Sequence, residues 1–321
     1  MKIIKRKKGD QITLEPVGSW PATMHEFEED SIWAVNAALA TGRPLLIRGL
    51  PGTGKSQLAR AVAQELGRIF LYQVVNAQTT AQDLQYYDDA VSRLGNAQTL
   101  AGVTDTSDIK RRLDPVRYLS PGILWWAFGW NSALEIYGKG TKVLSKPITS
   151  EGWQPEQGAV LLIDEIDKAD ADLPNGLLEI LGNGAFSIPY LGEPIRVDQA
   201  GTQPLVIIST NEERELPPAF LRRCLVLHLE LPRDPDELTR WLIRRGKVHH
   251  GDMDTNVMET AAQLTVDAVG QARNEGLPQP GQAEFLDLLR ALERLGGDSE
   301  DQSRVLDKIS QFALKKKQME Y

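Results

Sequence analysis

The sequence predicts an α/β fold, in which a parallel five-stranded sheet is flanked by helices and followed by a small all-α domain. The first observation is that short runs of Leu, Ile and Val alternate with helical patterns from Arg43 to about Pro232, as in βαβ units. The second is that only helical patterns follow Pro232. The 321 residues, 41% hydrophobic and 25% charged, suit a folded globular chain of about two packing units.

Five apolar runs are the strand candidates. Their density in Leu, Ile and Val predicts strands that are covered on both faces of the sheet. The candidates are Pro44–Arg48, Ile69–Val75, Ala159–Asp164, Leu205–Thr210 and Cys224–Leu231. Residues 76–158 separate the second candidate from the third, which is far more chain than a crossover needs, so we expect an insertion there.

Three regions follow from this pattern. Residues 1–20 are an N-terminal basic arm, residues 21–232 are an α/β domain with the insertion at about 76–158, and residues 233–321 are a C-terminal helical domain. Gly and Pro interrupt the last region and divide it into four predicted helices. These helices are Asp234–Lys247, Thr255–Glu275, Gln282–Leu295 and Glu300–Lys317.

Residues 49–56 match the phosphate-loop pattern G-x-x-x-x-G-K-[ST] at every fixed position. The motif lies between the first strand candidate and an amphipathic helix over Gln57–Leu66, which is the context that the pattern requires. Glycines let backbone N–H groups approach phosphate oxygens, while the lysine meets the β- and γ-phosphates and the serine hydroxyl meets Mg²⁺. The alternative is an ordinary glycine-rich turn. The expected nucleotide-binding residues are Gly49, Pro51, Gly52, Thr53, Gly54, Lys55, Ser56, Gln57 and Asp164.

Two carboxylates end the third strand candidate. Asp164 at a carboxyl strand end suits Mg²⁺, shared with Ser56, and Glu165 suits the polarisation of an attacking water. Asn211 follows the fourth candidate, and ligands of open α/β sheets lie at carboxyl strand ends, so its amide suits the orientation of that water. The alternative is that all three residues are solvated turn positions.

Arg222 and Arg223 come directly before the last strand candidate, on a predicted short helix. Adjacent arginines on a helix are ordinarily a solvated face. At this place an arginine can also reach the γ-phosphate that a neighbouring subunit holds, and stabilise the charge of the transition state.

Taken together, the phosphate loop, Asp164–Glu165, Asn211 and the two arginines, followed by a helical lid, resemble an AAA+ ATPase, and specifically its MoxR-like, dynein-related group. The enlarged segment with Ala81-Gln82-Asp83-Leu84 and the hairpin pattern over residues 184–197 carry the resemblance to that group. It implies ATP and Mg²⁺ as cofactors, a Walker A motif with Lys55 and Ser56, and a Walker B motif with Asp164 and Glu165. It also implies that Asn211 is sensor 1 and that Arg223, with Arg222 as the alternative, is the arginine finger.

One position departs from the resemblance. A sensor 2 arginine is expected near the start of the third lid helix, where this chain has Glu284. We therefore expect hydrolysis to depend mainly on the arginine of the adjacent subunit. Arg273 and Arg290 are the candidate replacements.

Aromatic side chains concentrate in the insertion, where Trp125, Trp126, Phe128 and Trp130 lie within six positions. One interpretation is that they pack the insertion against the sheet. The other is a surface that contacts a client protein, for which Tyr190 in the hairpin pattern is a second candidate.

The formal net charge is -8, and residues 9–314 hold 28 basic against 43 acidic residues, or -15. This excess argues against nucleic-acid binding. The longest apolar stretch is too short to span a membrane, and one cysteine suits a reducing compartment, so we expect no membrane insertion and a cytoplasmic location. The basic ends, residues 2–8 and 315–321, are expected to be solvated and disordered.

The sequence thus predicts an ATP-hydrolysing homo-oligomeric ring, expected to be a hexamer, that remodels or matures a protein client. The alternatives are a nucleic-acid-associated motor or a GTPase of restriction type, and a nucleotide-dependent assembly switch with little turnover. The motifs leave the client, the ring size and the choice between ATP and GTP open.

Overall fold

The structure is a computed structural model that describes residues 2–18, 20–100, 104–197 and 202–314. Its contacts divide the chain into two compact units. Unit 1 comprises Met1–Lys5, Asp30–Ile47 and Ala59–Leu227, and unit 2 comprises Arg6–Glu29, Arg48–Leu58 and His228–Tyr321. We describe each unit by itself.

Unit 1 contains the predicted five-stranded parallel sheet, in the order β11-β3-β10-β7-β4, and this confirms the predicted fold class. Every residue of the two central strands β7 and β10 is buried, which explains why both read as uninterrupted apolar runs. The strands differ from the sequence candidates by at most a few residues at their ends. They are β3 (Leu45–Arg48), β4 (Ile69–Val74), β7 (Ala159–Asp164), β10 (Leu205–Thr210) and β11 (Leu225–His228).

Helices cover the sheet because alternate side chains of each strand point to opposite faces. On one face Leu161 and Ile163 of β7 join a buried cluster with Trp125 and Leu177. That cluster draws on α6 (Ile123–Phe128) and α8 (Asp172–Asn183). The remaining helices of unit 1 outside the insertion are α1 (Glu29–Thr41), α2 (Lys55–Leu66) and α9 (Pro218–Arg223), with the short 3-10 helix η3 (Ile166–Lys168).

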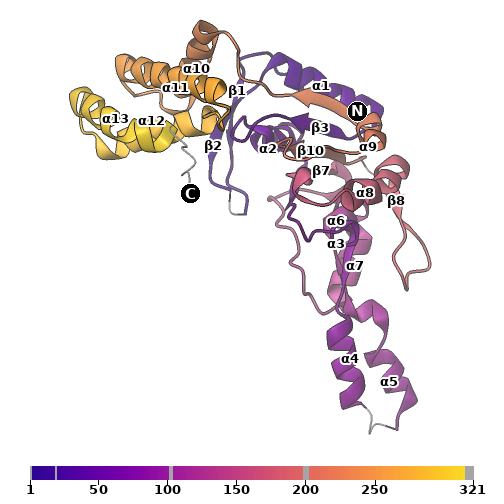
Figure 1. Ribbon diagram of the computed structural model, residues 1–321. Helices are drawn as coiled ribbons and strands as arrows, with labels where there is room; N and C mark the ends of the chain where they lie inside the picture. The colour runs from indigo at the N-terminus through magenta and orange to yellow at the C-terminus, as the bar shows by residue number, and fades with distance from the viewer. Residues whose placement is uncertain (1, 19, 101–103, 198–201, 315–321) are drawn as a thin grey trace. The chain divides into compact units, whose positions relative to one another are not determined.

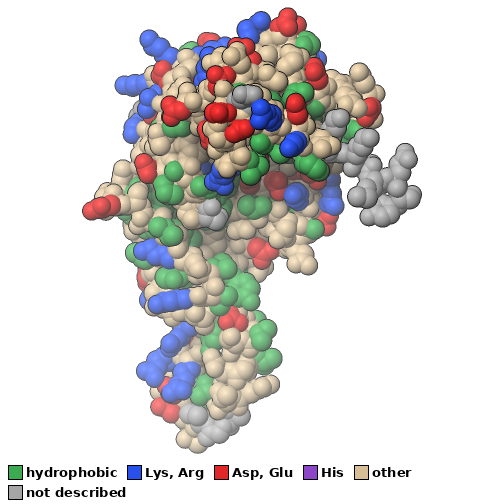
Figure 2. All heavy atoms as spheres, turned by 90° about the vertical axis from the view of Figure 1, so that its left-hand side faces the viewer, with side chains coloured by type: hydrophobic (Ala, Val, Ile, Leu, Met, Phe, Trp, Pro, Cys, Tyr) green, Lys and Arg blue, Asp and Glu red, His purple; other side chains and the backbone are tan. Residues whose placement is uncertain are grey.

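The predicted insertion is present after β4 and carries its own small hairpin, in which β5 pairs antiparallel with β6. In Figure 1 its α4 and α5 lie at the far end from the sheet. The last turn of α5 carries Lys110, Arg111 and Arg112, and Figure 2 shows Lys and Arg side chains gathered along one side of this outer part. The elements are α3 (Ala81–Gln85), β5 (Tyr86–Asp88), α4 (Ala90–Thr99), α5 (Thr106–Arg112), η1 (Pro115–Tyr118), β6 (Leu119–Pro121), α6, α7 (Trp130–Lys139) and η2 (Pro155–Gln157).

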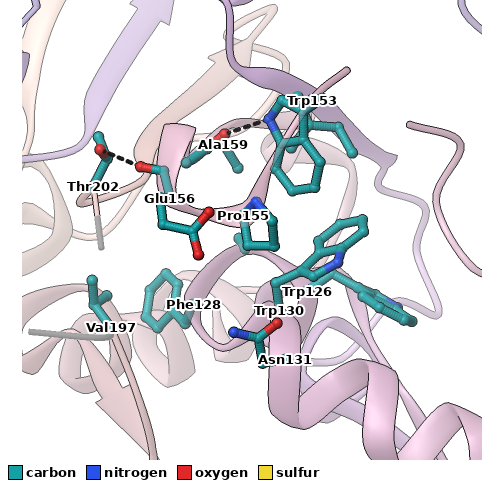
Figure 3. Close-up of a pocket in the computed structure, with 13 residues that line it drawn as sticks. Trp126, Phe128, Trp130, Asn131, Trp153, Pro155, Glu156, Ala159, Val197 and Thr202 are labelled. Atoms are coloured by element: carbon teal, nitrogen blue, oxygen red, sulfur yellow. Dashed lines mark hydrogen bonds between the residues drawn. The ribbon is translucent and has the colours of Figure 1, made fainter. Parts of the chain in front are cut away.

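The tryptophans of the insertion are buried. Trp125 and Trp126 are 0% and 2% exposed and Trp130 is 9% exposed, in the cluster that includes the sheet residues Leu161 and Ile163. The packing interpretation is therefore confirmed for them, and the client-contact interpretation is wrong, because buried rings offer no surface. Figure 3 shows Trp126, Trp130 and Trp153 around a small pocket of about 100 Å³. The rings of Trp130 and Trp153 pack edge to face there, with 4.7 Å between their centroids.

The hairpin predicted over residues 184–197 is also present, as β8 (Ala185–Phe186) paired antiparallel with β9 (Ile195–Arg196). Tyr190 lies between the two strands with 52% of its surface exposed, and the guanidinium of Arg93 lies over its ring at 5.5 Å. Tyr190 thus keeps the exposed surface that the buried tryptophans lack.

Unit 2 contains the four C-terminal helices around a core of Met258, Phe285, Leu289 and Leu292, all at most 1% exposed. The side chains of Asp234 and Asp254 accept hydrogen bonds from backbone N–H groups and so cap the first two helices. The helices are α10 (Pro235–His249), α11 (Thr255–Glu275), α12 (Gln282–Leu295) and α13 (Ser299–Leu314). The predicted extension of the last helix to Lys317 and the basic C-terminal end lie outside the described residues.

The N-terminal residues correct one prediction. Residues 2–14 are not a solvated arm: β1 (Gln11–Leu14) pairs antiparallel with β2 (Thr23–Glu26), and Leu14 is 1% exposed. In unit 1 the backbone of Ile4 exchanges two hydrogen bonds with the side chain of Asn36, at 2.8 and 3.0 Å, and Lys2 donates to the carbonyl of Leu66. The charge count concealed these apolar positions between the lysines, and burying them orders the segment. Among the described residues, no helix is long and apolar enough to cross a membrane.

Candidate nucleotide-binding and catalytic site

The phosphate loop follows β3 directly and is described within unit 2. Gly49, Gly52 and Gly54 adopt φ angles of 154°, 77° and 93°, which favour glycine. A side chain at Gly49 would also lie 2.3 Å from the carbonyl oxygen of Leu229, so the loop has no room for one. These are the conformations that a backbone cradle for phosphate requires.

Lys55 opens α2 and is only 6% exposed. Its Nζ donates to the carbonyl oxygens of Gly49 and Leu50 at 2.7 and 2.9 Å, and the Thr53 hydroxyl donates to the same Leu50 oxygen at 2.9 Å. The ammonium group is thereby held inside the curve of the loop, where a bound phosphate chain would replace carbonyl oxygens as its partner. Ser56 and Gln57, in the first turn of α2, are half-buried, and Pro51 is exposed.

The acidic pair lies in unit 1 at the carboxyl end of β7. The hydroxyl of Ser209, on the adjacent β10, donates to Oδ1 of Asp164 and accepts from the backbone N–H of Glu165 at 2.8 Å. Ser209 is fully buried, and Asp164 is 8% exposed. Glu165 follows with a left-handed φ of 59°, so the chain turns sharply there and its carboxylate leaves the strand.

Asn211 lies beside Glu165, as the sequence predicts. Its Nδ2 donates to Oε1 of Glu165 at 3.1 Å, and Lys168 forms an ion pair with Oε2 of the same carboxylate at 2.8 Å. The hydrogen bond to Glu165 and its charge raise the pKa of Lys168 above its ordinary value. Both oxygens of Glu165 are therefore fixed, one by Asn211 directly after β10 and the other by Lys168 in η3.

Asp167 holds the backbone that carries Asn211. Its buried carboxylate accepts from the N–H groups of Asn211, at 3.1 Å to Oδ2, and of Glu213, at 2.9 Å. A carboxylate that accepts from two backbone amides makes a rigid joint between the segments that follow β7 and β10.

Arg222 and Arg223 end α9, just before β11, and both are exposed. Their backbone is fixed by Arg43, whose guanidinium donates to the carbonyl oxygens of Arg222, Arg223 and Cys224 at 2.6, 3.1 and 3.1 Å. Burial raises the pKa of the Cys224 thiol to about 11, although the charge of Arg43 acts in the opposite direction.

Comparison with known proteins agrees with this arrangement. The model of the ATPase family associated with various cellular activities (AAA) matches residues 45–233, more than half of the chain. The chain belongs to the AAA family. A Lon protease homologue, mitochondrial, from Phaeodactylum tricornutum is 26% identical over 238 residues, which cover 71% of this chain and 21% of that relative. The chain thus spans about a fifth of the relative's length.

The AAA match includes the phosphate loop, the acidic pair, Asn211 and both arginines. Of these, the structure of unit 1 brings Glu165 and Asn211 into contact. Arg222 and Arg223 precede β11 at its amino end, whereas Asp164 and Asn211 follow carboxyl ends of parallel strands. The sequence predicts separate roles for the two arginines and for the acidic pair with Asn211, but it does not show that they lie at opposite ends of the sheet.

Three residues of this AAA site were missed from the sequence: Ser209, Asp167 and Lys168. Ser209 is an ordinary strand residue by its pattern, and only the register, which pairs Ile208 with Ile163, shows that it faces the end of β7. Asp167 and Lys168 lie in the acidic run after Glu165, where solvated positions are the usual interpretation. The helix η3 has only three residues, so its sequence shows no periodicity that would indicate which side chain points inward.

The expected sensor 2 position has another role in this AAA chain. Glu284 is the third residue of α12, and its Oε2 accepts from the N–H of Gly281 at 2.9 Å, which caps the helix. Within unit 2 this helix start packs on the phosphate loop, because a side chain at Gly52 would lie 2.8 Å from Cβ of Ala283. An acidic cap thus lies beside the loop in place of an arginine. Arg273 bonds to Gln279, and Arg290 forms an ion pair with Asp287, both on exposed surface.

The chemistry of the donors suits magnesium nucleotide. The described residues contain no group of three or more His, Cys, Asp or Glu that would hold a metal ion alone. A hydroxyl from Ser56 and a carboxylate from Asp164 are hard oxygen ligands, and Mg²⁺ prefers such oxygens together with phosphates and water. The chemistry of these two oxygen donors therefore fits Mg²⁺.

Proposed function

We propose that the chain is an ATP-hydrolysing AAA ATPase of the MoxR-like type, which assembles into a ring and remodels or matures a protein partner. The observation that carries the proposal is the hydrogen bond between Asn211 and Glu165 at adjacent carboxyl strand ends. A carboxylate oriented by an amide is the arrangement that activates and positions water for attack on a phosphoryl group.

The proposed roles follow from the donors. The loop around Lys55 binds the phosphates, Ser56 and Asp164 hold Mg²⁺, and Glu165 accepts the proton of the attacking water, which Asn211 orients. Mg²⁺ offsets the charge of the β- and γ-phosphates when it is bound. Lys168 holds Glu165 in place through an ion pair with Oε2 at 2.8 Å.

Assembly is the second part of the proposal. Arg222 and Arg223 lie at the amino end of β11, whereas the phosphate loop follows the carboxyl end of β3, a neighbour of β11 in the sheet. Arginines at that end are suited to the nucleotide of a second copy. The ring, which we propose to be a hexamer, places them there.

A protein partner is supported by two observations. The Lon protease homologue bears a name that assigns it an action on proteins. Tyr190 at the β8–β9 hairpin is exposed and aromatic, which is the side-chain type that anchors protein contacts. The acidic body, with its net charge of -15 over residues 9–314, disfavours the nucleic-acid alternative.

The test is a steady-state ATPase assay with Mg²⁺ across the concentration range in which the chain assembles. We expect the rate per subunit to rise with assembly. Lys55→Ala should abolish ATP binding, whereas Glu165→Gln should bind ATP and fail to turn it over, because the amide keeps the shape but accepts no proton. Arg111→Ala on the outer insertion is the matched control and should behave as wild type.

Three outcomes would contradict parts of the proposal. A rate per subunit that stays constant on dilution refutes the shared site. Nucleotide-driven assembly without turnover favours the assembly switch. Preference for GTP in the same assay favours the restriction-type GTPase.

A further inference from the structure

One small pocket of unit 1, of about 100 Å³, is lined mainly by aromatic and apolar side chains. Its described lining residues include four aromatic rings and one carboxylate, and no Lys or Arg. These residues, which define the tryptophan pocket, are Trp126, Phe128, Trp130, Trp153 and Glu156. Aromatic surface together with a single negative charge is a composition that suits an organic cation.

The three tryptophan rings are held in place by packing. The centroids of Trp126 and Trp130 are 4.9 Å apart at an interplanar angle of 59°, and those of Trp130 and Trp153 are 4.7 Å apart at 67°. The rings are thus inclined to one another rather than stacked, and each contributes surface to the pocket. Nε1 of Trp153 donates to the carbonyl oxygen of Gly158 at 3.3 Å, which fixes the orientation of that ring (Figure 3). The electron-rich faces of aromatic rings attract cations, so rings fixed in advance favour a positively charged ligand.

Glu156 supplies the negative charge. It lies in η2 with an exposed side chain, and in Figure 3 its carboxylate points between Phe128 and Pro155. Its backbone carbonyl oxygen accepts from the hydroxyl of Thr202 at 2.7 Å, which holds the backbone at this point. The carboxylate forms no ion pair with a described residue. A bound cation would therefore meet a carboxylate that has no competing positive partner in the described part of the chain.

The volume limits the ligand to a head group. A dry cavity of about 150 Å³ accommodates benzene, so about 100 Å³ suits a group of about four or five non-hydrogen atoms. Trp126 and Trp130 are buried, and only a group that is small enough to enter the pocket reaches them. A primary ammonium ion holds its water strongly, whereas a quaternary ammonium ion presents methyl groups that suit contact with aromatic rings.

The tryptophan pocket lies at the opposite end of the sheet from the acidic pair. Ile69 and Ala159, which line it, are the first residues of β4 and β7 and are paired in the parallel register. Asp164 is the sixth residue of β7, so about 16 Å of strand separates the two ends, at about 3.3 Å per residue. A ligand in the pocket would therefore leave Asp164 free for its own chemistry.

We propose that the tryptophan pocket binds a quaternary ammonium head group. The tryptophan rings surround its methyl groups, and the Glu156 carboxylate balances its charge. This site is additional to the proposed ATPase function and does not depend on it.

Choline and its neutral isostere 3,3-dimethylbutan-1-ol, in which carbon replaces the nitrogen, test the proposal on the full chain. Saturation-transfer NMR follows the methyl protons of either probe through a titration. We expect choline to bind saturably and the neutral isostere to bind about tenfold more weakly, because only choline gains from the charge. Equal affinity for the two probes, or no saturable binding of choline, would overturn the proposal.

Variants assign the binding to the tryptophan pocket. Glu156→Gln keeps the size of an exposed side chain and should weaken choline binding about fivefold, as for unit charges about 4 Å apart in water. Trp153→Leu keeps an apolar wall without the ring and should weaken it about tenfold, whereas Trp153→Phe should weaken it less. Glu151→Gln is the matched control, because this exposed carboxylate lies outside the described lining, and its Kd should equal that of wild type. Circular dichroism checks that each variant is folded. Wild-type affinity in both Glu156→Gln and Trp153→Leu would refute this pocket as the site.

The head group can belong to a free molecule or to a trimethylated lysine side chain. A peptide with one trimethyl-lysine, titrated beside its unmethylated form, separates these sources. Tighter binding of the methylated peptide than of choline identifies a modified side chain as the ligand, and the reverse order identifies a free molecule; both orders support the site. Binding of the unmethylated peptide as tight as that of the methylated form would contradict it. These titrations contain no nucleotide, so the pocket and the proposed ATPase function stand or fall separately.

Discussion

Removal of one buried hydroxyl should lower both stability and the rate of catalysis while leaving ATP affinity almost unchanged. Ser209→Ala deletes the oxygen that donates to Asp164 and accepts from the backbone N–H of Glu165. The site is fully buried, so water cannot easily replace the lost partner. The change removes one atom and leaves every other side chain of the candidate site in place.

The magnitude follows from the two bonds. A hydrogen bond to a charged group contributes about 1.5–3 kcal/mol, and a buried N–H left without a partner costs about 1–3 kcal/mol. The expected loss is about 2.5–6 kcal/mol in the free energy of unfolding. For a domain of this size about 1 kcal/mol shifts the melting temperature by about 2–4 °C, so the shift should be about 5–24 °C.

Catalysis should suffer more than binding. Asp164 and Glu165 lose their common partner on β10, and loss of geometry on the scale of 1 Å can cost about 100-fold in rate. ATP affinity should change little, because the phosphate loop makes no use of Ser209. Steady-state kinetics below the melting transition measure kcat, and a fluorescent nucleotide titration measures the Kd.

Ser132→Ala is the matched control. The Ser132 hydroxyl also makes two bonds, accepting from Nε1 of Trp125 at 2.8 Å and donating to the carbonyl oxygen of Gly129 at 2.9 Å, but it lies in the insertion. It should lose stability with an unchanged kcat. If Ser209→Ala keeps the wild-type kcat, or if both variants lose kcat equally, then Ser209 does not organise the site.

Further predictions concern titration, thiol access and the lid. Burial, and to a smaller extent the charge of Arg245, lowers the pKa of His25 to about 3, while burial and His250 lower the pKa of His249 to about 4. As the pH falls below about 6.5, these histidines therefore gain protons in the unfolded chain before they do in the folded chain, and the folded chain loses stability. The urea concentration at the unfolding midpoint should fall between about pH 6.5 and about pH 4, and it should fall less in the double variant His25→Gln, His249→Gln. Cys224 has a raised pKa and should react slowly with a thiol reagent at pH 8 in the wild-type chain. It should react faster in Arg43→Ala, because that change loosens the α9–β11 junction, and equal rates of modification in the two chains would show that Arg43 does not hold the junction. Glu284→Gln keeps the helix cap and removes a negative charge beside the phosphate loop. The Kd for ATP should fall about two- to fivefold, which is the effect expected of charges about 8 Å apart in water. A higher Kd would show that the Glu284 carboxylate does not repel the phosphates.

The fold was accessible from the sequence because the strands are short, apolar and covered on both faces. β7 and β10 agree with their candidates at both ends, since every residue of each strand is buried and the apolar run is uninterrupted. The N-terminal segment was not accessible. Its charge dominates its composition, whereas its structure depends on the burial of Ile4 and Leu14 and on the hydrogen bonds between the Ile4 backbone and Asn36.

The candidate site divides in the same way. Residues fixed by a local motif, such as Lys55 and Glu165, were named from the sequence because their chemistry depends on near neighbours. Ser209 was not, because its contacts with Asp164 and Glu165 arise from strand register. A single sequence contains no direct signal for this kind of proximity.

The absence of a sensor 2 arginine changes how nucleotide state can reach the lid. In unit 2 the start of α12 packs directly on the phosphate loop, with Ala283 in contact range of Gly52 and Glu284 capping the helix beside it. An arginine would sense the γ-phosphate by attraction over a distance. Here close packing transmits any shift of the loop backbone to α12, and the acidic cap opposes the approach of phosphate. The position of α12 should therefore follow the geometry of the phosphate loop.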